Sequence, residues 1–241
     1  KNMIQPIIDR ASIPIFNFLE DEISTNYISS TGKEGYNNIH YSIFFKNFNY
    51  VSFLKDTSFK FEKEFFKNEL TKKKLIKDKK KLFVFHSAVG HAPYYKNVPK
   101  KYLDKNLNIF TEEKLLKIIG KKYGFNKDIH IPDYISNIDY SFDTISEIIK
   151  LLDKDKPTVL IYLSDHGESV YTGNGHDSSR FVHEMLRIPF FVYFNKSFLE
   201  KRNKIYNEFK QDEEKIITTD YLPKMLLKLY NLQSFYDEYF D

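Results

Sequence analysis

The chain has 241 residues, of which 41% are hydrophobic and 17% aromatic, and its formal net charge is +4. This composition excludes an intrinsically disordered chain, and a small net charge without a concentrated basic face gives no support for binding to nucleic acid. The absence of cysteine excludes a disulfide framework and thiolate chemistry. The length suits one α/β domain, so we expect a single domain over residues 1–241.

The first part of the chain predicts helices and strands in alternation. Apolar residues at helical spacing predict a helix over Ile4–Ala11, and a run that opens with proline predicts a strand over Ile13–Leu19. Phe and Leu alternate with Lys and Glu over Tyr50–Leu70, which indicates an amphipathic helix that covers the sheet. The apolar run Lys81–Phe85 predicts a second strand, and it ends at His86.

The second part continues the alternation. It predicts a short helix over Glu112–Ile119, a long helix over Tyr134–Leu152, strands over Thr158–Leu163 and Ile188–Phe194, and a final helix over Thr219–Leu229. The long helix has one apolar face, formed by Ile135, Ile138, Phe142, Ile145, Ile148, Ile149 and Leu152. Strands that alternate with helices predict an α/β fold with a mostly parallel central sheet and helices on both faces.

Acidic and imidazole side chains follow the predicted strands. Asp165 and His166 come directly after Thr158–Leu163, at the carboxyl end of a strand, where open α/β sheets place their ligands. A carboxylate beside an imidazole favours Zn²⁺, with Mn²⁺ as the alternative. His86, His91 and His176 also lie at or just past strand ends. We therefore expect one metal site at this edge of the sheet, formed by groups from several strands.

Other residues near this edge receive less specific predictions. Glu168 is either a ligand or base, or the residue that orients His166. His183, His40 and His130 lack a strand-end position, and we expect them to be structural. Ser164 and Ser169 flank the Asp-His pair, but no Gly-x-Ser-x-Gly motif supports a serine nucleophile. No phosphate-binding glycine loop is present, so nucleotide chemistry has no support.

Several motifs together resemble one known family. They are Ser-Asp-His-Gly-Glu-Ser at 164–169, the segment from Leu82 to Tyr95 with Gly90-His91, the pair Gly175-His176, and Thr218–Pro223. This pattern is similar to the periplasmic catalytic domain of phosphoethanolamine transferases, which belong to the alkaline phosphatase and sulfatase superfamily. The similarity extends over most of the chain from about Ile4 onward.

The resemblance implies roles and partners. Asp165 and His166 match two zinc ligands, while His91 and His176 match histidines that contact the phosphoryl group or a second zinc. His86 and Glu168 are candidates for holding these ligands in place. The donor would be phosphatidylethanolamine, the intermediate a phospho-threonine, and the acceptor a cell-envelope glycan or lipid A, as in lipopolysaccharide modification. Such enzymes work at the periplasmic face of the bacterial inner membrane, anchored through an N-terminal region.

One part of the family pattern has no match here. The nucleophilic threonine and a glutamate ligand precede the first helix in the family, and we do not assign either Thr25 or Thr31 to the nucleophile's role. Two side-chain ligands alone predict weak zinc binding. No apolar run approaches the roughly 18 residues of a membrane span, so the chain as given is expected to be soluble.

Three interpretations stay open. The first is the C-terminal portion of a membrane-anchored phosphoethanolamine transferase. The second is a sulfatase or phosphodiesterase of the same superfamily, in which water replaces the acceptor. The third is a degenerate relative that kept the fold as a binding or assembly domain and lost its catalysis.

Overall fold

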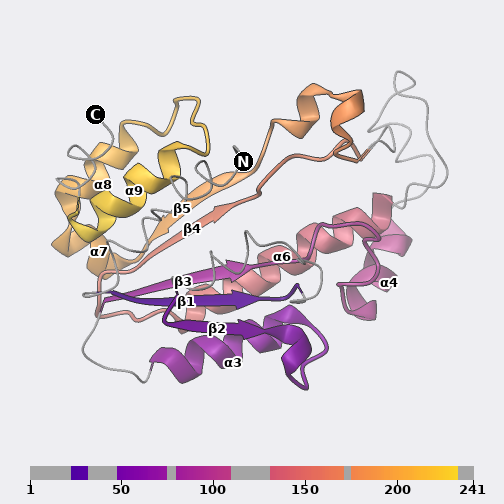
Figure 1. Ribbon diagram of the computed structural model, residues 1–241, viewed down its shortest axis with the longest axis horizontal. Helices are drawn as coiled ribbons and strands as arrows, with labels where there is room; N and C mark the ends of the chain where they lie inside the picture. Colours follow the sequence, from indigo (N-terminus) through magenta and orange to yellow (C-terminus); the bar gives the residue numbers. More distant parts are fainter. Residues whose placement is uncertain (1–22, 32–47, 75–79, 110–130, 171–174, 233–241) are drawn as a thin grey trace, which may run out of the picture.

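The computed structural model describes residues 23–31, 48–74, 80–109, 131–170 and 175–232, and its strands form two groups (Figure 1). Strands β1 (Ile23–Ser29), β2 (Tyr50–Phe53) and β3 (Lys80–His86) make a parallel sheet in the order β2-β1-β3. Strands β4 (Val159–Leu163) and β5 (Phe190–Phe194) pair in antiparallel orientation. A parallel sheet accompanied by helices confirms the predicted α/β class.

The described helices lie between and after these strands. They are α3 (Glu62–Lys74), α4 (Lys100–Ile109), α6 (Ile131–Leu151), α7 (Lys196–Lys201), α8 (Asn203–Lys210) and α9 (Tyr221–Tyr230), with 3-10 turns η3 (Leu54–Asp56), η5 (Ser178–Arg180) and η6 (His183–Met185). Helices α7, α8 and α9 gather beside β4 and β5 (Figure 1). There Phe194 of β5 lies 5.1 Å from the Phe198 ring and 5.3 Å from the Tyr206 ring.

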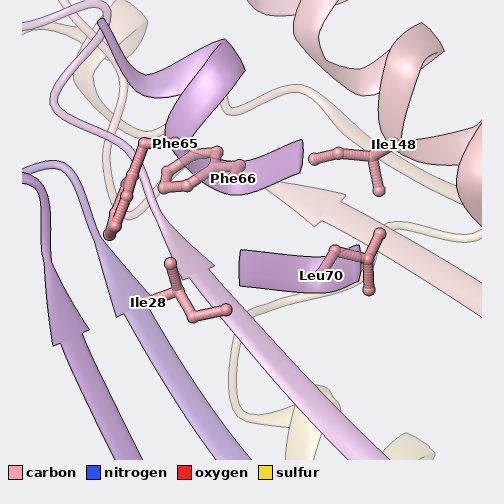
Figure 2. Packing of buried hydrophobic residues seen from close by; sticks show 5 residues of the cluster. All are labelled: Ile28, Phe65, Phe66, Leu70 and Ile148. Atoms are coloured by element: carbon pink, nitrogen blue, oxygen red, sulfur yellow. The ribbon is translucent and has the colours of Figure 1, made fainter. Parts of the chain in front are cut away.

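The main core lies between the parallel sheet and the helices α3 and α6. Figure 2 shows its five buried residues, Ile28, Phe65, Phe66, Leu70 and Ile148. On the opposite face of the sheet, Tyr27 packs with Phe48 and Phe53. Because successive side chains of a strand point to opposite faces, Tyr27 and Ile28 anchor the two sides, and β1 is the central, doubly covered strand.

Helix α6 confirms the predicted long helix, but its buried face differs from the prediction. Ile138 and Phe142 are exposed, whereas Ser136, Asn137 and Thr144 are buried. Each of these polar side chains donates a hydrogen bond to a backbone carbonyl of the same helix: Ser136 to Pro132, Asn137 to Asp133 and Thr144 to Tyr140. Hydrogen bonds of this kind remove the cost of burying polar groups, which a count of apolar residues does not include.

One further prediction was wrong in the described residues, and one strand was not predicted. The segment Tyr50–Leu70 is not one helix: it begins as β2, whose Val51 pairs with Tyr27, and α3 starts only at Glu62. Strand β1 was not predicted, because Ser24, Thr25 and Asn26 interrupt its apolar pattern. The predicted helices Ile4–Ala11 and Glu112–Ile119, and the predicted strand Ile13–Leu19, lie outside the described residues.

The remaining predicted elements are confirmed. Strands β3, β4 and β5 and helix α9 lie where the sequence predicts them. Asn195 fixes the opposite end of β4, since its Oδ1 accepts from the Thr158 and Phe198 amides at 3.0 and 2.8 Å. Within the described ranges, no helix combines the length and apolar character that crossing a bilayer requires.

Candidate metal centre

Two glycines set the path of the chain after β4. A Cβ on Gly167 would lie 2.0 Å from the Glu184 carbonyl oxygen, and the Gly167 amide donates to the Met185 carbonyl at 2.8 Å. Only glycine fits this close approach. Gly175 has a φ of +58°, in the left-handed region, and its carbonyl accepts from the Ser169 amide at 2.8 Å. This pairing brings His176 back over Glu168.

His166, Glu168 and His176 form a three-residue group at the carboxyl end of β4. One ligand atom from each lies within 4.8 Å of the others, and the two imidazole centroids are 4.2 Å apart. The Glu168 side chain is 12% exposed, while those of His166 and His176 are 39% and 46% exposed. Two imidazoles and one carboxylate are a donor set that suits zinc, so these residues fit a divalent ion.

The hydrogen bonds of two histidines define their tautomers. Nδ1 of His166 lies 2.9 Å from the Gly167 carbonyl oxygen, and Nδ1 of His91 lies 2.7 Å from that of Ala92. A carbonyl oxygen only accepts, so each Nδ1 carries the hydrogen and each neutral ring presents an Nε2 lone pair. The His91 ring is 5.9 Å from that of His176. His91 therefore lies at the rim of the three-residue group.

Tyr94 orients the carboxylate of Glu168. Its hydroxyl donates to Glu168 Oε1 at 3.2 Å, and the other carboxylate oxygen lies 3.6 Å from His176 Nδ1. Burial and then the adjacent carboxylate raise the pKa of Tyr94, which keeps the phenol a neutral donor. Sequence reasoning did not assign a role to Tyr94, although it stands three residues after His91 in the same motif.

Asp165 lies outside the three-residue group. Its side chain is 83% exposed, and Oδ2 is 3.8 Å from His166 Nε2. Its Oδ1 accepts from the His166 amide at 3.0 Å, which holds the carboxylate close to the turn of the main chain. The structure thus brings together His166 and His176, as the sequence predicts, with Glu168 in the position closest to them. Asp165 as a ligand stays a prediction.

His86 is tied into the parallel sheet. Its Nδ1 lies 2.7 Å from the Tyr27 hydroxyl and 3.2 Å from Ser29 Oγ. Burial lowers the pKa of His86, and the charge of Asp165 acts in the opposite direction. Thr25 is fully buried and bonded to Asn49, and Thr31 is bonded to Ser29. The three-residue group itself contains neither threonine.

Glu62 connects the ends of β1 and β3 through hydrogen bonds, a role that the sequence did not predict. It is 3% exposed and accepts hydrogen bonds from Ser30 Oγ at 2.7 Å and from Ser87 Oγ at 2.8 and 2.7 Å. Burial raises its pKa to about 7, against the opposing effect of the two hydroxyls. In sequence Glu62 is one acid among many in a charged segment, so no local signal distinguishes it.

Asn137 of α6 fixes the loop that carries His91. Its Oδ1 accepts from the Gly90 amide at 2.8 Å, and its Nδ2 donates to the Tyr94 carbonyl at 2.7 Å. Gly90 itself has a φ of +103°, a left-handed conformation that favours glycine. One buried amide therefore bonds the loop on both sides of His91.

Comparison with known proteins connects this geometry to a family. Residues 14–232 match the sequence profile of the sulfatase family. The chain is 33% identical, over 133 residues, to phosphoethanolamine transferase EptA of Helicobacter pylori; the match includes 53% of this chain and 24% of that protein. The chain thus spans about a quarter of the length of this relative.

Solved structures show the same fold. The C-terminal periplasmic domain of EcEptC from Escherichia coli superposes with a TM-score of 0.62 at 17% identity, over 88% of this chain and 57% of that domain. The same domain in complex with Zn gives 0.59 at 18% identity, over 75% and 51%. The periplasmic domain of EptC from Campylobacter jejuni gives 0.58 at 23%, over 87% and 62%.

Proposed function

Because the chain belongs to the sulfatase family, we propose that it is the metal-binding portion of a phosphoethanolamine transferase. The observation that carries the proposal is the meeting of His166, Glu168 and His176 at the carboxyl end of β4, beside His91. The identity to the Helicobacter pylori transferase supports this branch of the family over the hydrolytic ones.

His166, Glu168 and His176 would hold a divalent ion, with zinc favoured by the two imidazoles and Mn²⁺ as the alternative. The zinc-bound structure of a related domain supports this assignment. Such an ion supplies positive charge to a transferring phosphoryl group and lowers the pKa of an oxygen nucleophile. Asp165, exposed at the start of the same segment, is the further ligand that the family resemblance implies.

The proposed reaction has two displacements. A threonine oxygen, not assigned to any residue of this chain, attacks the phosphorus of phosphatidylethanolamine; the bond to the diacylglycerol oxygen breaks, and that oxygen takes a proton. A hydroxyl of a glycan or lipid A then attacks the phospho-threonine and restores the threonine. His91, exposed at the rim, is placed to move these protons through Nε2. By family, the site would face the periplasm at the inner membrane.

The test offers the complete natural protein a phosphatidylethanolamine, with and without lipid A. Transfer predicts that the release of diacylglycerol beyond one equivalent per enzyme depends on the acceptor, and that lipid A gains one phosphoethanolamine in its mass spectrum. Release of free phosphoethanolamine regardless of the acceptor would replace this proposal with hydrolysis. A complete protein that binds zinc but turns over neither way would be the degenerate binding domain.

A further inference from the structure

The carboxyl group of Glu62 is buried between the ends of two parallel strands. Glu62 is the first residue of α3 and is 3% exposed. Its oxygens accept from Ser30, directly after β1, and from Ser87, directly after β3. Between described residues no ion pair includes Glu62, so hydroxyl groups and not a cation satisfy these oxygens. Burying an acid without a cation costs stability, and acids of this kind cluster at functional sites.

Ser30 and Ser87 connect this carboxyl group to the loop after β3. The Oγ of Ser30 accepts from the Ala88 amide at 2.7 Å. The Oγ of Ser87 accepts from the Val89 amide at 3.0 Å. Because a hydroxyl has a single hydrogen and two lone pairs, each serine can donate to Glu62 and accept from an amide at once. Two consecutive amides of the loop are thus held, through two hydroxyls, by one carboxyl group.

Ala88 connects these hydrogen bonds to His91. The Ala88 carbonyl accepts from the His91 amide at 3.3 Å and from Asn97 Nδ2 at 3.0 Å. The centroid of the His91 ring is 5.9 Å from that of His176. The place of His91 beside the metal-binding group therefore depends on where Ala88 lies, and Ser30 holds Ala88.

The three-residue metal-binding group is held by other contacts. The Gly167 amide donates to the Met185 carbonyl, which fixes the segment after β4. Tyr94, which donates to Glu168, is fixed through its carbonyl by Asn137. Neither contact involves the carboxyl group at the start of α3. A change in that group should therefore reach the loop after β3 and leave the metal ligands in place.

We propose that Glu62 is a positioning residue of the transfer reaction, which holds His91, through Ser30 and Ser87, where its Nε2 can move protons for the reacting oxygens. This role deepens the proposed function and rests on it, because proton transfer by His91 belongs to that function. Glu62 is not a member of the metal-binding group. A displacement of about 1 Å in a reacting group can slow a reaction by about 100-fold, so a residue that acts only through others can control the rate.

Amide hydrogen exchange tests the connection to the loop without any turnover. Glu62→Gln keeps the size of the side chain but replaces one acceptor oxygen by an NH₂ group, so a serine hydroxyl loses its acceptor. We expect the Ala88 and Val89 amides to exchange at least about tenfold faster in this variant. The Gly90 amide should keep its rate, because it donates to Asn137. Unchanged exchange at Ala88 and Val89 would overturn the proposal.

Steady-state kinetics of the complete natural protein test the effect on the reaction. Glu62→Gln is expected to lower kcat at least about tenfold, with the KM for phosphatidylethanolamine and the zinc affinity within about twofold of the wild type. Glu64→Gln is the control, since the Glu64 side chain is exposed in the same helical turn. A fall in zinc affinity as large as the fall in kcat would show a general structural role and contradict the inference.

Ser87→Ala gives a second variant, in which the carboxyl group stays and one connection to the loop is lost. If Glu62 acts through this serine, Glu62→Gln should lower kcat less in the Ser87→Ala background than in the wild type. An equal loss in both backgrounds would show that the two side chains act independently, which would refute the proposed connection.

The activity of the wild type separates the two possible failures. A complete wild-type protein that transfers no phosphoethanolamine would refute the proposed function, and with it the catalytic importance of Glu62, even if the Ala88 and Val89 amides exchange faster in the variant. A wild type that transfers the group, with a Glu62→Gln variant that keeps its kcat, would refute only the positioning role.

Discussion

Glu62 is a buried acid whose neutral form the fold favours. Burial raises its folded pKa from 4.5 to about 7, so between these values the folded protein binds more protons than the unfolded chain. The contribution to stability is therefore complete below pH 4.5 and is lost as the pH rises toward 7. At about 1.4 kcal/mol for each pKa unit, the loss is up to about 3 kcal/mol.

Glu62→Gln is expected to remove this pH dependence. The difference between the unfolding free energies of the wild type and the variant should fall by up to about 3 kcal/mol between pH 4.5 and 7, measured by urea denaturation. Glu64→Gln is the control, because Glu64 lies in the same helical turn with an exposed side chain. Parallel pH profiles for the wild type and Glu62→Gln would refute the assignment.

Two neighbouring carboxylates compete for the role of metal ligand. Glu168 is within 4.8 Å of both histidine ligand atoms, whereas Asp165 is mainly exposed. We expect Glu168→Gln to weaken zinc binding by at least about tenfold and Asp165→Asn to weaken it less. Competition with a chromophoric chelator measures both. A greater loss for Asp165→Asn would show that the carboxylate closest in this structure is not the principal ligand.

Tyr94→Phe tests the support of that carboxylate. The variant loses only the hydroxyl that donates to Glu168 Oε1. A positioning role predicts a loss of up to about tenfold in zinc affinity with little change in melting temperature. Tyr95→Phe is the matched control, since Tyr95 is 53% exposed beside it. Equal zinc affinities for the wild type and Tyr94→Phe would remove Tyr94 from the site.

Helix α6 connects the core to the candidate site through Asn137. Asn137→Ala would leave the Gly90 amide and the Tyr94 carbonyl without their buried partner. We expect this loss to lower the unfolding free energy by roughly 2 to 3 kcal/mol. Asn207→Ala, at an exposed position of α8, should change the unfolding free energy by less than about 0.5 kcal/mol. Chemical denaturation gives both values, and a loss for Asn137→Ala as small as that of the control would contradict the role.

The elements that the sequence predicts are those whose apolar pattern is continuous. Strands β3, β4 and β5 are short apolar runs, and α6 has helical spacing over its whole length. Strand β1 escaped prediction because Thr25 and Asn26 are buried through hydrogen bonds to Asn49 and to Leu82, which lie far away in sequence. The prediction of which face of α6 is buried was wrong for the same reason. Periodicity detects burial by hydrophobicity and misses burial by hydrogen bonding.

At the scale of the whole molecule, the edge at which the candidate site lies could be predicted from the sequence. The carboxyl ends of β3 and β4 meet at one edge, so histidines that follow separate strands converge there. The sequence did not indicate Tyr94, which contacts Glu168, or Asn137 and Glu62, which support the loops and strand ends nearby. Each is defined by a partner at least 25 residues away, with which only the tertiary fold brings it into contact.

Zinc binding should stabilise the folded chain as a whole, because an ion that binds only the folded state shifts the folding equilibrium toward that state. The described group offers three ligands, His166, Glu168 and His176. Zinc binding should therefore be tighter than the weak binding expected for two side-chain ligands. At a zinc concentration of 100 Kd the gain is about 2.7 kcal/mol, or roughly 5 to 10 °C in Tm for a chain of this size.

Differential scanning calorimetry with and without zinc measures this shift, and a chelator should reverse it. The double variant His166→Ala, His176→Ala is the control, because both side chains are partly exposed and their loss removes two of the three ligands with little effect on packing. Its Tm should not respond to zinc. Since His166 and His176 approach each other only in the folded chain, an equal shift in the double variant would place the zinc elsewhere and remove the metal from this edge of the sheet.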